Sequence, residues 1–278
     1  MTIETLLEFA TKTLSNRFES EILLAFVLKE DRTHLYTWPK KEVSPEQEAQ
    51  FNSMIARRVK GEPIAYLVGE KEFWSLPLTV SPAVLIPRPE TEILIEAVLK
   101  KFPKTPSIRV LDLGTGSGAI ALALAAERPQ WEIIATDISQ EALDLAKHNA
   151  KRLNIQNVKF YWGDWFEAIR FFDKPNNSFD LIVSNPPYIA EQDPHLKVGG
   201  LEYEPQIALL GGKQGLTALQ TIISESPNYL NPLAWLMVEH GYDQQNGVRD
   251  LMQSNKFTEI SCIMDQFGKC RVTIGSHP

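Results

Sequence analysis

A side-chain amide, two prolines and an aromatic ring stand together in the segment VSNPPYI, residues 183–189. A primary amide or an exocyclic amine is a weak nucleophile, because the lone pair on its nitrogen is delocalised. Two acceptors for its two N–H groups, the Asn185 side-chain oxygen and the Pro186 carbonyl, would point that lone pair at an electrophilic methyl group. Pro187 helps to fix the carbonyl, and Tyr188 can stack on a planar amide or base. The segment therefore predicts a site that methylates a planar amino group.

A glycine-rich turn, DLGTGSGAI, is the second stretch that could bind a ligand. Its glycines, Gly114, Gly116 and Gly118, allow positive φ angles and close approach of the backbone. The helix that follows directs free N–H groups at a negative group such as a carboxylate. With Ala119 in the last position, the turn also matches a nicotinamide-binding pattern. The turn alone therefore leaves the kind of cofactor open.

Two residues further along would complete a nucleoside site. Asp137 lies 23 residues after Gly114 and is placed to accept hydrogen bonds from ribose hydroxyls. Trp165, in the segment GDWF, would supply a flat apolar wall for a purine.

These residues must be positioned by strands and helices, and the sequence predicts a doubly wound α/β sheet with an antiparallel hairpin at its end. Apolar runs predict strands at residues 108–113, 131–137, 157–162, 179–184, 234–240, 257–263 and 270–276, and helical spacing predicts helices at 118–129, 139–153, 215–230 and 243–255. Ligands of such a sheet bind at the carboxyl ends of its strands. Four consecutive strands end in the glycine turn, Asp137, GDWF and NPPY, so we expect all four at one edge. The long connection at residues 189–213 is expected to be functional.

The first 70 or so residues are expected to be helical, because apolar residues recur there at helical spacing. Ser44 before Pro45 is typical of a helix start. We predict an N-terminal helical substrate-recognition domain at residues 1–72, a linking hairpin at 73–107 and a ligand-binding domain at 108–278.

Composition narrows the class of protein. The chain has 278 residues, 44% of them hydrophobic, which is enough for a sizeable core. No apolar stretch approaches the roughly 20 residues that a membrane helix needs, and the amino terminus lacks a signal-peptide pattern. The net charge of −7 is spread without a basic patch, which argues against direct nucleic-acid binding. We expect a cytosolic protein without a membrane partner.

The cysteines and histidines predict no metal site. Cys262 and Cys270 lack metal-ligand spacing, and two cysteines build no disulfide framework, so we expect two separate and at least partly buried side chains. The five histidines are scattered along the chain.

The segments DLGTGSGAIAL, ATD, GDWF and SNPPYI together resemble the class I S-adenosylmethionine-dependent methyltransferases that modify planar amino groups. EFWSLPLTVSPAVLIPRPETE and NPPYIAEQDPHL, with the helical amino-terminal domain, are similar to the peptide chain release factor glutamine methyltransferases, the PrmC/HemK family. The resemblance covers nearly the whole chain. NPPY is shared with DNA and RNA adenine methyltransferases, whereas LIPRPETE is much more specific. The stretch AIRFFDKPNNS, residues 168–178, looks long for the family.

The resemblance implies a Rossmann-like class I methyltransferase sheet with an antiparallel last strand, and S-adenosyl-L-methionine as cofactor. It implies contacts to the amino acid moiety of the cofactor from Gly114, Thr115, Gly116, Ser117 and Gly118, to the ribose from Asp137 and to the adenine from Trp165. Asn185 would face both cofactor and substrate, and Pro186, Pro187 and Tyr188 would hold the glutamine amide. Asn185, Pro186 and Tyr188 are thus the expected catalytic residues, while the role of the segment RPETE stays open, a helix start being one reading.

The activity implied is methylation of the side-chain amide nitrogen of the glutamine in the Gly-Gly-Gln motif of class 1 peptide chain release factors, by a monomer. A glutamine methyltransferase of a ribosomal protein would use the same site. An adenine N6 methyltransferase of DNA or RNA would explain NPPY, but it predicts a basic groove and a target-recognition domain, and neither is visible. A nicotinamide oxidoreductase leaves NPPY unexplained, and a binding module needs no aligned strand ends.

Overall fold

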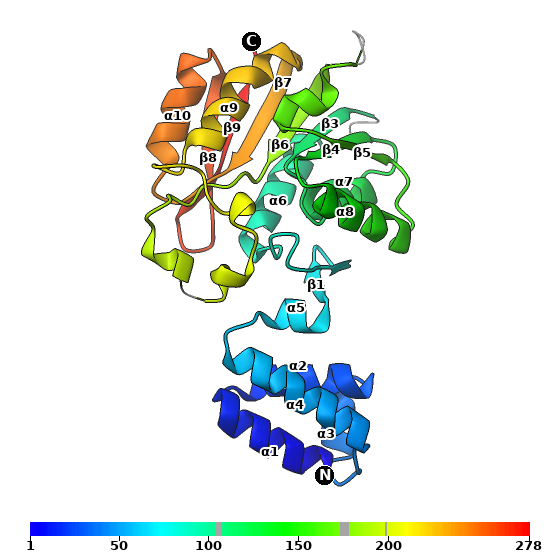
Figure 1. The fold of residues 1–278 in the computed structure, drawn as a ribbon. Helices are drawn as coiled ribbons and strands as arrows, with labels where there is room; N and C mark the ends of the chain where they lie inside the picture. Colours follow the sequence, from blue (N-terminus) through cyan, green and yellow to red (C-terminus); the bar gives the residue numbers. More distant parts are fainter. Residues whose placement is uncertain (104–106, 173–177, 198) are drawn as a thin grey trace. The chain divides into compact units, whose positions relative to one another are not determined.

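The computed structural model describes residues 1–103, 107–172, 178–197 and 199–278 (Figure 1). Its chain forms two compact units. One consists of Met1–Glu70 with Lys197–Tyr203, and the other of Lys71–Leu196 with Glu204–Pro278. Residues 173–177, in the stretch that looks long for the family, lie outside the described residues. No helix in the described part of the chain is long and apolar enough to cross a membrane.

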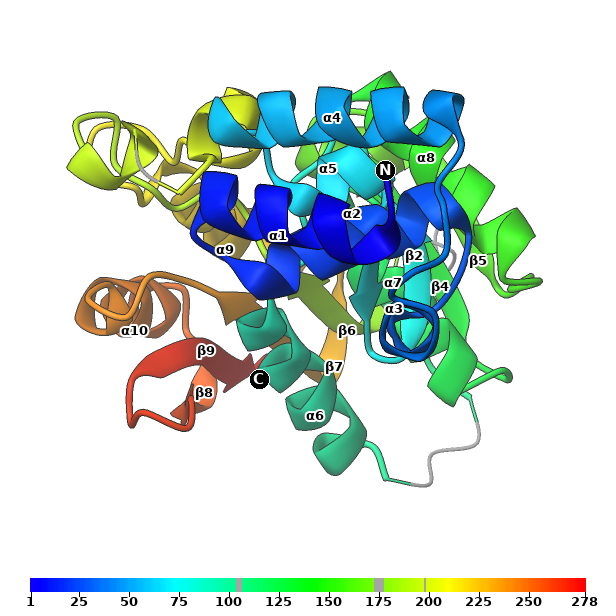
Figure 2. The same ribbon diagram turned by 90° about the horizontal axis from the view of Figure 1, so that it is seen from below.

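The first unit is helical. Its helices are α1 (Ile3–Leu14), α2 (Arg17–Leu28), α3 (Arg32–Thr37), α4 (Pro45–Val59) and α5 (Ile64–Val68). Figure 2 shows α1, α2 and α4 side by side. Leu6, Leu24 and Phe51, one from each helix, are fully buried in their shared core. The expected helix start is confirmed: Ser44 accepts from the Gln47 N–H in a capping box, with Pro45 in the first turn.

A short segment from the far half of the chain completes this unit. Lys197–Tyr203 includes the end of the 3₁₀ turn η3 (Pro194–Lys197) and the turn η4 (Leu201–Tyr203). The Tyr203 hydroxyl donates to the Lys60 carbonyl at 2.7 Å, just beyond α4. The helical unit is therefore built from two separate stretches of sequence.

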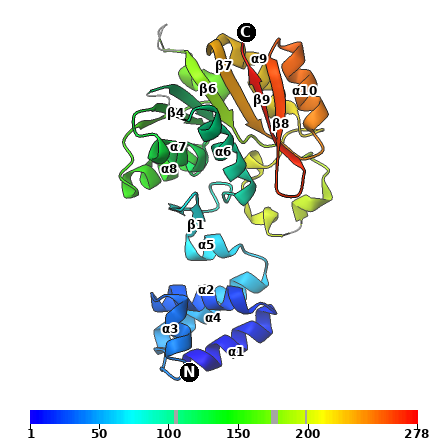
Figure 3. The same cartoon turned by 180° about the vertical axis from the view of Figure 1, so that it is seen from behind.

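The second unit is a seven-stranded sheet in the order β5-β4-β3-β6-β7-β9-β8 (Figures 1 and 3). Its strands are β3 (Arg109–Leu113), β4 (Glu132–Asp137), β5 (Val158–Trp162), β6 (Phe179–Ser184), β7 (Leu230–Glu239), β8 (Thr258–Met264) and β9 (Cys270–Ser276). The pairs among β3 to β7 are parallel, while β9 is antiparallel to β7 and to β8. The expected Rossmann-like methyltransferase sheet with an antiparallel last strand is confirmed.

Helices cover both faces of this sheet. α6 (Glu92–Lys101), α7 (Ala119–Glu127) and α8 (Gln140–Arg152) pack on one face, where Val110 and Val183 point; Figure 3 shows α6 across it. α9 (Thr217–Glu225) and α10 (Gln245–Ser254) pack on the other, where Leu111 and Ile182 point. Burial on both faces explains why these strands read as continuous apolar runs.

The linking region is more helical than expected. The hairpin is only β1 (Glu70–Phe73) and β2 (Leu76–Thr79), and the 3₁₀ turn η1 (Pro89–Thr91) leads directly into α6. The start of α6 was hard to predict, because the prolines at 77, 82, 87 and 89 interrupt the apolar pattern just before this helix.

Cys262 is half-buried and Cys270 is buried, as expected, but the expectation that the two cysteines build no disulfide was wrong. The structure joins Cys262 and Cys270 in a disulfide, with their Cα atoms 5.9 Å apart. The β8–β9 hairpin brings the two residues to neighbouring strands, and spacing in the sequence alone gave no sign of it.

Candidate active site

A cavity of about 570 Å³ lies in the sheet unit, where β3, β4 and β6 end. Most of the expected site residues line it: Gly114, Thr115, Gly116, Ser117, Asp137, Trp165, Asn185 and Pro187. Gly118, Pro186 and Tyr188 are not among the lining residues described. The cavity is also lined by residues within 83–91 and 205–221, which the sequence reading had not assigned. The carboxyl ends of the strands thus converge on one cavity, as expected for the ligand site of an α/β sheet.

The glycine turn leaves β3 and begins α7. The N–H groups of Gly114 and Thr115 both donate to the Thr136 carbonyl at 2.9 Å, which fixes the turn to the end of β4. Gly116 has a φ of 57° and lines the cavity, and an added Cβ would meet nothing within 4 Å. The backbone at Gly116 is therefore open to a ligand. Gly118 is the N-cap of α7.

Asp137 stands at the end of β4. Its Oδ2 accepts from the Gly116 N–H at 2.8 Å, and its Oδ1 from the Ser139 N–H at 2.9 Å. Burial raises the pKa of Asp137, while these backbone donors lower it. Each carboxylate oxygen has a further lone pair, so the group can still accept from a ligand hydroxyl.

Asp112, near the end of β3, is a buried acid that sequence reading missed. The Thr115 hydroxyl donates to its Oδ2 at 2.6 Å, beneath the glycine turn. Burial raises the pKa of Asp112 to about 7. It stood inside an apolar strand, and only its position just before the turn could have singled it out.

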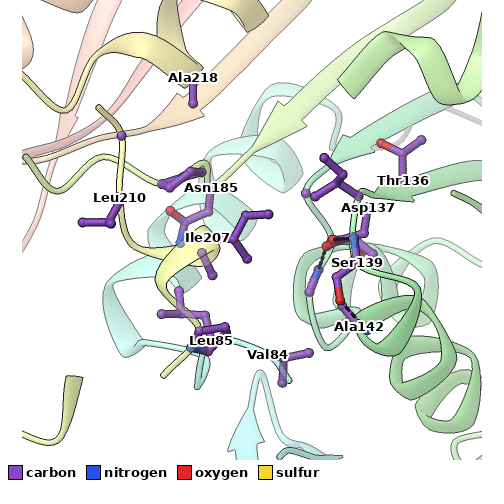
Figure 4. A pocket seen from close by; sticks show the side chains of 18 of the residues that line it. Val84, Leu85, Thr136, Asp137, Ser139, Ala142, Asn185, Ile207, Leu210 and Ala218 are labelled. Atoms are coloured by element: carbon purple, nitrogen blue, oxygen red, sulfur yellow. Dashed lines mark hydrogen bonds between the residues drawn. The ribbon is translucent and has the colours of Figure 1, made fainter. Parts of the chain in front are cut away.

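Asn185 follows β6 and faces the same cavity. In Figure 4 it lies on the opposite side from Asp137 and Ser139. Its Nδ2 donates to the Thr91 hydroxyl at 2.9 Å, in the RPETE segment whose role was open. The strand end before it is fixed, because the buried Ser184 hydroxyl donates to the Leu113 carbonyl at 2.7 Å.

Tyr188 points elsewhere: its hydroxyl donates to Glu239 Oε1 at 3.2 Å. Burial raises its pKa above the usual range of a tyrosine, and the charge of Glu239 adds to this. Glu239 ends β7 and is 1% exposed. Glu239 could have been found from the sequence, because it is a polar residue at the carboxyl end of a fifth apolar strand.

The chain after NPPY is held by the loop at residues 205–217. The Ile189 N–H donates to the Leu209 carbonyl and the Gly211 N–H to the Ile189 carbonyl, both at 2.9 Å. Gln244 Nε2 donates to the Tyr188 carbonyl at 2.9 Å. Gly215, with a φ of 72°, passes so close that an added Cβ would lie 2.2 Å from the same carbonyl. Residues 209–211, in the long connection that we expect to be functional, thus hold the segment directly after NPPY.

An ion pair joins two further segments beside the cavity. Arg88 pairs with the buried Glu204, whose other oxygen accepts from the Ile86 N–H at 3.0 Å. This connects the segment before η1 to the start of the 205–217 loop. Over the described residues, no group of three or more His, Cys, Asp or Glu side chains is placed to hold a metal ion.

Comparisons with known proteins agree with this architecture. Residues 104–270 match the family model described as "Methyltransferase domain", and residues 5–69 match the "PrmC N-terminal domain". A solved methyltransferase from Pyrococcus furiosus has the same fold, with a TM-score of 0.54 at 22% identity over 81% of this chain and 98% of its own.

Curated relatives match at much higher identity. The release factor glutamine methyltransferase of Coxiella burnetii is 46% identical over 96% of this chain and 94% of its own. That of Yersinia pestis is 48% identical over 95% and 94%. At this identity and coverage, the chain belongs to the family of release factor glutamine methyltransferases.

Proposed function

We propose that this protein transfers a methyl group from S-adenosyl-L-methionine to the side-chain amide nitrogen of the glutamine in the Gly-Gly-Gln motif of a class 1 peptide chain release factor. One observation supports this most: Asn185 and Pro187 of the Asn-Pro-Pro corner line the same cavity as the glycine turn and Asp137. A cofactor pocket alone would fit many enzymes, whereas an amide-binding corner opposite it fits few. The names of the curated relatives supply the substrate.

The residues present fit S-adenosyl-L-methionine. The open backbone at Gly116 and the start of α7 suit its carboxylate. Asp137 retains acceptor capacity for ribose hydroxyls, and the ring of Trp165 lines the cavity as a wall for adenine. When bound, the cofactor supplies a methyl group on a sulfonium, which is already a good leaving group.

The chain's own residues then have to orient the substrate. The Asn185 side-chain oxygen and the Pro186 carbonyl would each accept one N–H of the glutamine amide, leaving its nitrogen lone pair directed into the cavity. Both acceptors stand on a corner fixed by Ser184 and by two prolines. Such positioning is the main catalytic contribution needed. The amide becomes acidic only as the new C–N bond forms, so its proton can leave to water.

We further propose that residues 1–72 recognise the folded release factor, that 73–107 link, and that 108–278 bind the cofactor, with the enzyme acting as a cytoplasmic monomer. A free glutamine side chain offers few contacts, so selectivity has to come from a remote surface. The helical unit and the match to the PrmC N-terminal domain support such a surface.

A side-by-side assay tests the proposal. The full-length enzyme is offered release factor, ribosomal proteins, duplex DNA and tRNA with labelled S-adenosyl-L-methionine, and labelled products are mapped. We expect label on the Gly-Gly-Gln glutamine, and labelling slowed by roughly 10²- to 10³-fold after Asn185→Ala. Label in a glutamine of a ribosomal protein would show that the substrate is a ribosomal protein and not a release factor. Label in adenine that falls steeply with added salt would overturn the proposal in favour of a nucleic-acid enzyme.

A further inference from the structure

The side-chain amide of Gln244 makes hydrogen bonds to three separate segments of the chain at the end of NPPY. Its Nε2 donates to the Tyr188 carbonyl at 2.9 Å and to the Gly215 carbonyl at 3.2 Å, with a longer contact to the Gln214 carbonyl at 3.4 Å. Its Oε1 accepts from the Gly241 N–H at 2.8 Å. One amide group thus joins the turn after β7 and the loop at residues 205–217 to the last residue of NPPY.

The chemistry of these partners determines which way the Gln244 amide points. A backbone N–H can only donate and a carbonyl can only accept, so Oε1 faces Gly241 and the NH₂ group faces Tyr188 and Gly215. In the flipped orientation, every one of these contacts would pair two donors or two acceptors. The backbone of Gln244 is held as well, because its carbonyl accepts from the Val248 N–H at 3.0 Å at the start of α10. The amide therefore has one orientation and a fixed base.

The backbone of NPPY needs an anchor at this end. The rings of Pro186 and Pro187 fix φ, and a residue that precedes a proline is restricted to extended conformations. The segment is therefore stiff from Asn185 to Pro187, and the Ser184 hydroxyl holds its upstream end. At Tyr188 neither proline constraint applies, so the direction of its carbonyl depends on the groups that contact it.

Two glycines bring the loop at residues 205–217 against the same backbone. A Cβ added to Gly211 would lie 2.6 Å from the Pro187 carbonyl. A Cβ added to Gly215 would lie 2.2 Å from the Tyr188 carbonyl and 2.6 Å from Gln244 Nε2. Because the contact is this close, a change in the direction of the Tyr188 carbonyl has to break its hydrogen bond with Gln244.

We infer that Gln244 is a positioning residue of the methyl transfer, whose amide fixes the Tyr188 peptide group and with it the downstream end of the corner that presents Asn185 and Pro186 to the substrate. The inference rests on the proposed function, because it assigns to that corner the binding of the substrate amide. Gln244 is not among the described residues that line the cavity. It therefore acts through NPPY, and its loss should lower kcat and leave cofactor affinity unchanged.

The substitution Gln244→Glu removes the donors of this side chain and keeps its acceptor. The carboxylate has nearly the same shape and can still accept from the Gly241 N–H, but it cannot donate to the carbonyls of Tyr188 and Gly215. We expect kcat to fall roughly 10- to 100-fold, the effect of misplacing a reacting group. The KM for the release factor and the Kd of S-adenosylhomocysteine should stay close to those of the wild type. Expressing kcat per bound S-adenosylhomocysteine removes any contribution from misfolded protein.

The neighbouring residue offers a matched control. Gln245→Glu makes the same chemical change at the first residue of α10, and no side-chain hydrogen bond of Gln245 is recorded among the described residues. Its kcat should be nearly normal. Wild-type kcat in Gln244→Glu, an equal loss of kcat in both variants, or a loss that appears only in KM or in cofactor affinity would each overturn the inference.

A measurement without substrate keeps this inference distinct from the proposed function. The Ile189 N–H donates to the Leu209 carbonyl and the Gly211 N–H to the Ile189 carbonyl, directly beside the anchored peptide group. In Gln244→Glu, hydrogen exchange of the Ile189 and Gly211 amides should lose protection, while exchange in β3 stays unchanged. Unchanged protection of both amides refutes the inference whatever the enzyme methylates. If protection is lost as expected but the wild type labels no release factor, the proposed function is what fails.

Discussion

In the proposed reaction, the chemistry depends most directly on the side chain of Asn185. Asn185→Ala removes one of the two acceptors for the substrate amide, so turnover should fall by roughly 10²- to 10³-fold, or about 3 to 4 kcal/mol, as for other preorganised hydrogen-bonding groups. Single-turnover methylation of the release factor measures this loss. Turnover equal to that of the wild type would contradict the assignment of the site.

Asp137 should govern cofactor affinity. Asp137→Ala removes the proposed acceptor for the ribose and also the acceptor of the Gly116 and Ser139 N–H groups. Losing hydrogen bonds to a charged group costs about 1.5 to 3 kcal/mol, so S-adenosylhomocysteine should bind roughly 10- to 100-fold more weakly by calorimetry.

Asp144→Ala, which removes an exposed carboxylate on α8, is the control for Asp137→Ala and should bind normally. A wild type stabilised against heat by NADH and not by S-adenosylmethionine would show that the cofactor assignment is wrong.

Single residues were predictable where their chemistry is unusual for their position. Asn185 and Asp137 follow apolar strands, and polar groups at strand ends are informative. The hydrogen bond from Asn185 to Thr91 was not predictable, because the two residues are far apart in the sequence and a threonine in a helix start is ordinary. Asp112 was missed for a similar reason: burial, which raises its pKa, is a property of the folded sheet.

The loop at residues 205–217 positions NPPY through close backbone contact at Gly215. Gly215→Ala would place a Cβ 2.2 Å from the Tyr188 carbonyl, so the segment must shift and activity should fall roughly 10²-fold. Gly268→Ala is a matched control, because its φ of 73° is nearly the same but its Cβ would meet nothing within 4 Å. Equal activity of the two variants would show that the close contact is unimportant.

The strand β3 carries a buried acid whose ionisation opposes folding. The folded-state pKa of Asp112 is raised from 3.8 to about 7, so its stabilising contribution is fully present below about pH 4 and is lost as the pH rises through 7. Since each pKa unit corresponds to about 1.4 kcal/mol, the free energy of unfolding should fall by an amount on the order of 4 kcal/mol. Asp112→Asn stays neutral throughout.

Urea unfolding of the two proteins at pH 4 and pH 8 measures this effect. The free energy of unfolding of Asp112→Asn relative to the wild type should increase by that amount over the range. Comparing the two proteins cancels the other titrating groups, including Glu239 and His240. A difference that does not vary with pH would mean that Asp112 is ionised in the folded protein.

The sheet could be predicted from the sequence because buried apolar strands alternate regularly with segments of helical spacing over most of the second unit. The helix α6 and the Cys262–Cys270 disulfide could not be predicted. The prolines before α6 interrupt its helical pattern, and the disulfide depends on how the β8–β9 hairpin pairs. The 205–217 loop has little periodicity, so its contacts with Tyr188 and Ile189 emerge only in three dimensions.

The whole molecule should discriminate strongly between a folded partner and a peptide. If residues 1–72 bind the release factor, its binding energy helps to hold the glutamine amide in place. We expect kcat/KM for the folded factor to exceed that for a short Gly-Gly-Gln peptide by roughly 10²-fold or more.

A release factor with its glutamine replaced by glutamate should compete with the intact factor without accepting label. Equal kcat/KM for factor and peptide would mean that the enzyme reads only the motif.

The composition of the helical unit has a consequence for chimaeras between members of the family. Lys197–Tyr203 belongs to that unit, so the chain passes between the units three times, near residues 70, 196 and 203. Exchanging residues 1–70 alone would set a foreign α4–α5 turn against the resident Tyr203, whose hydroxyl bonds the Lys60 carbonyl. A working exchange needs both stretches transplanted together, because the helical unit is discontinuous in the sequence even though it is compact in space.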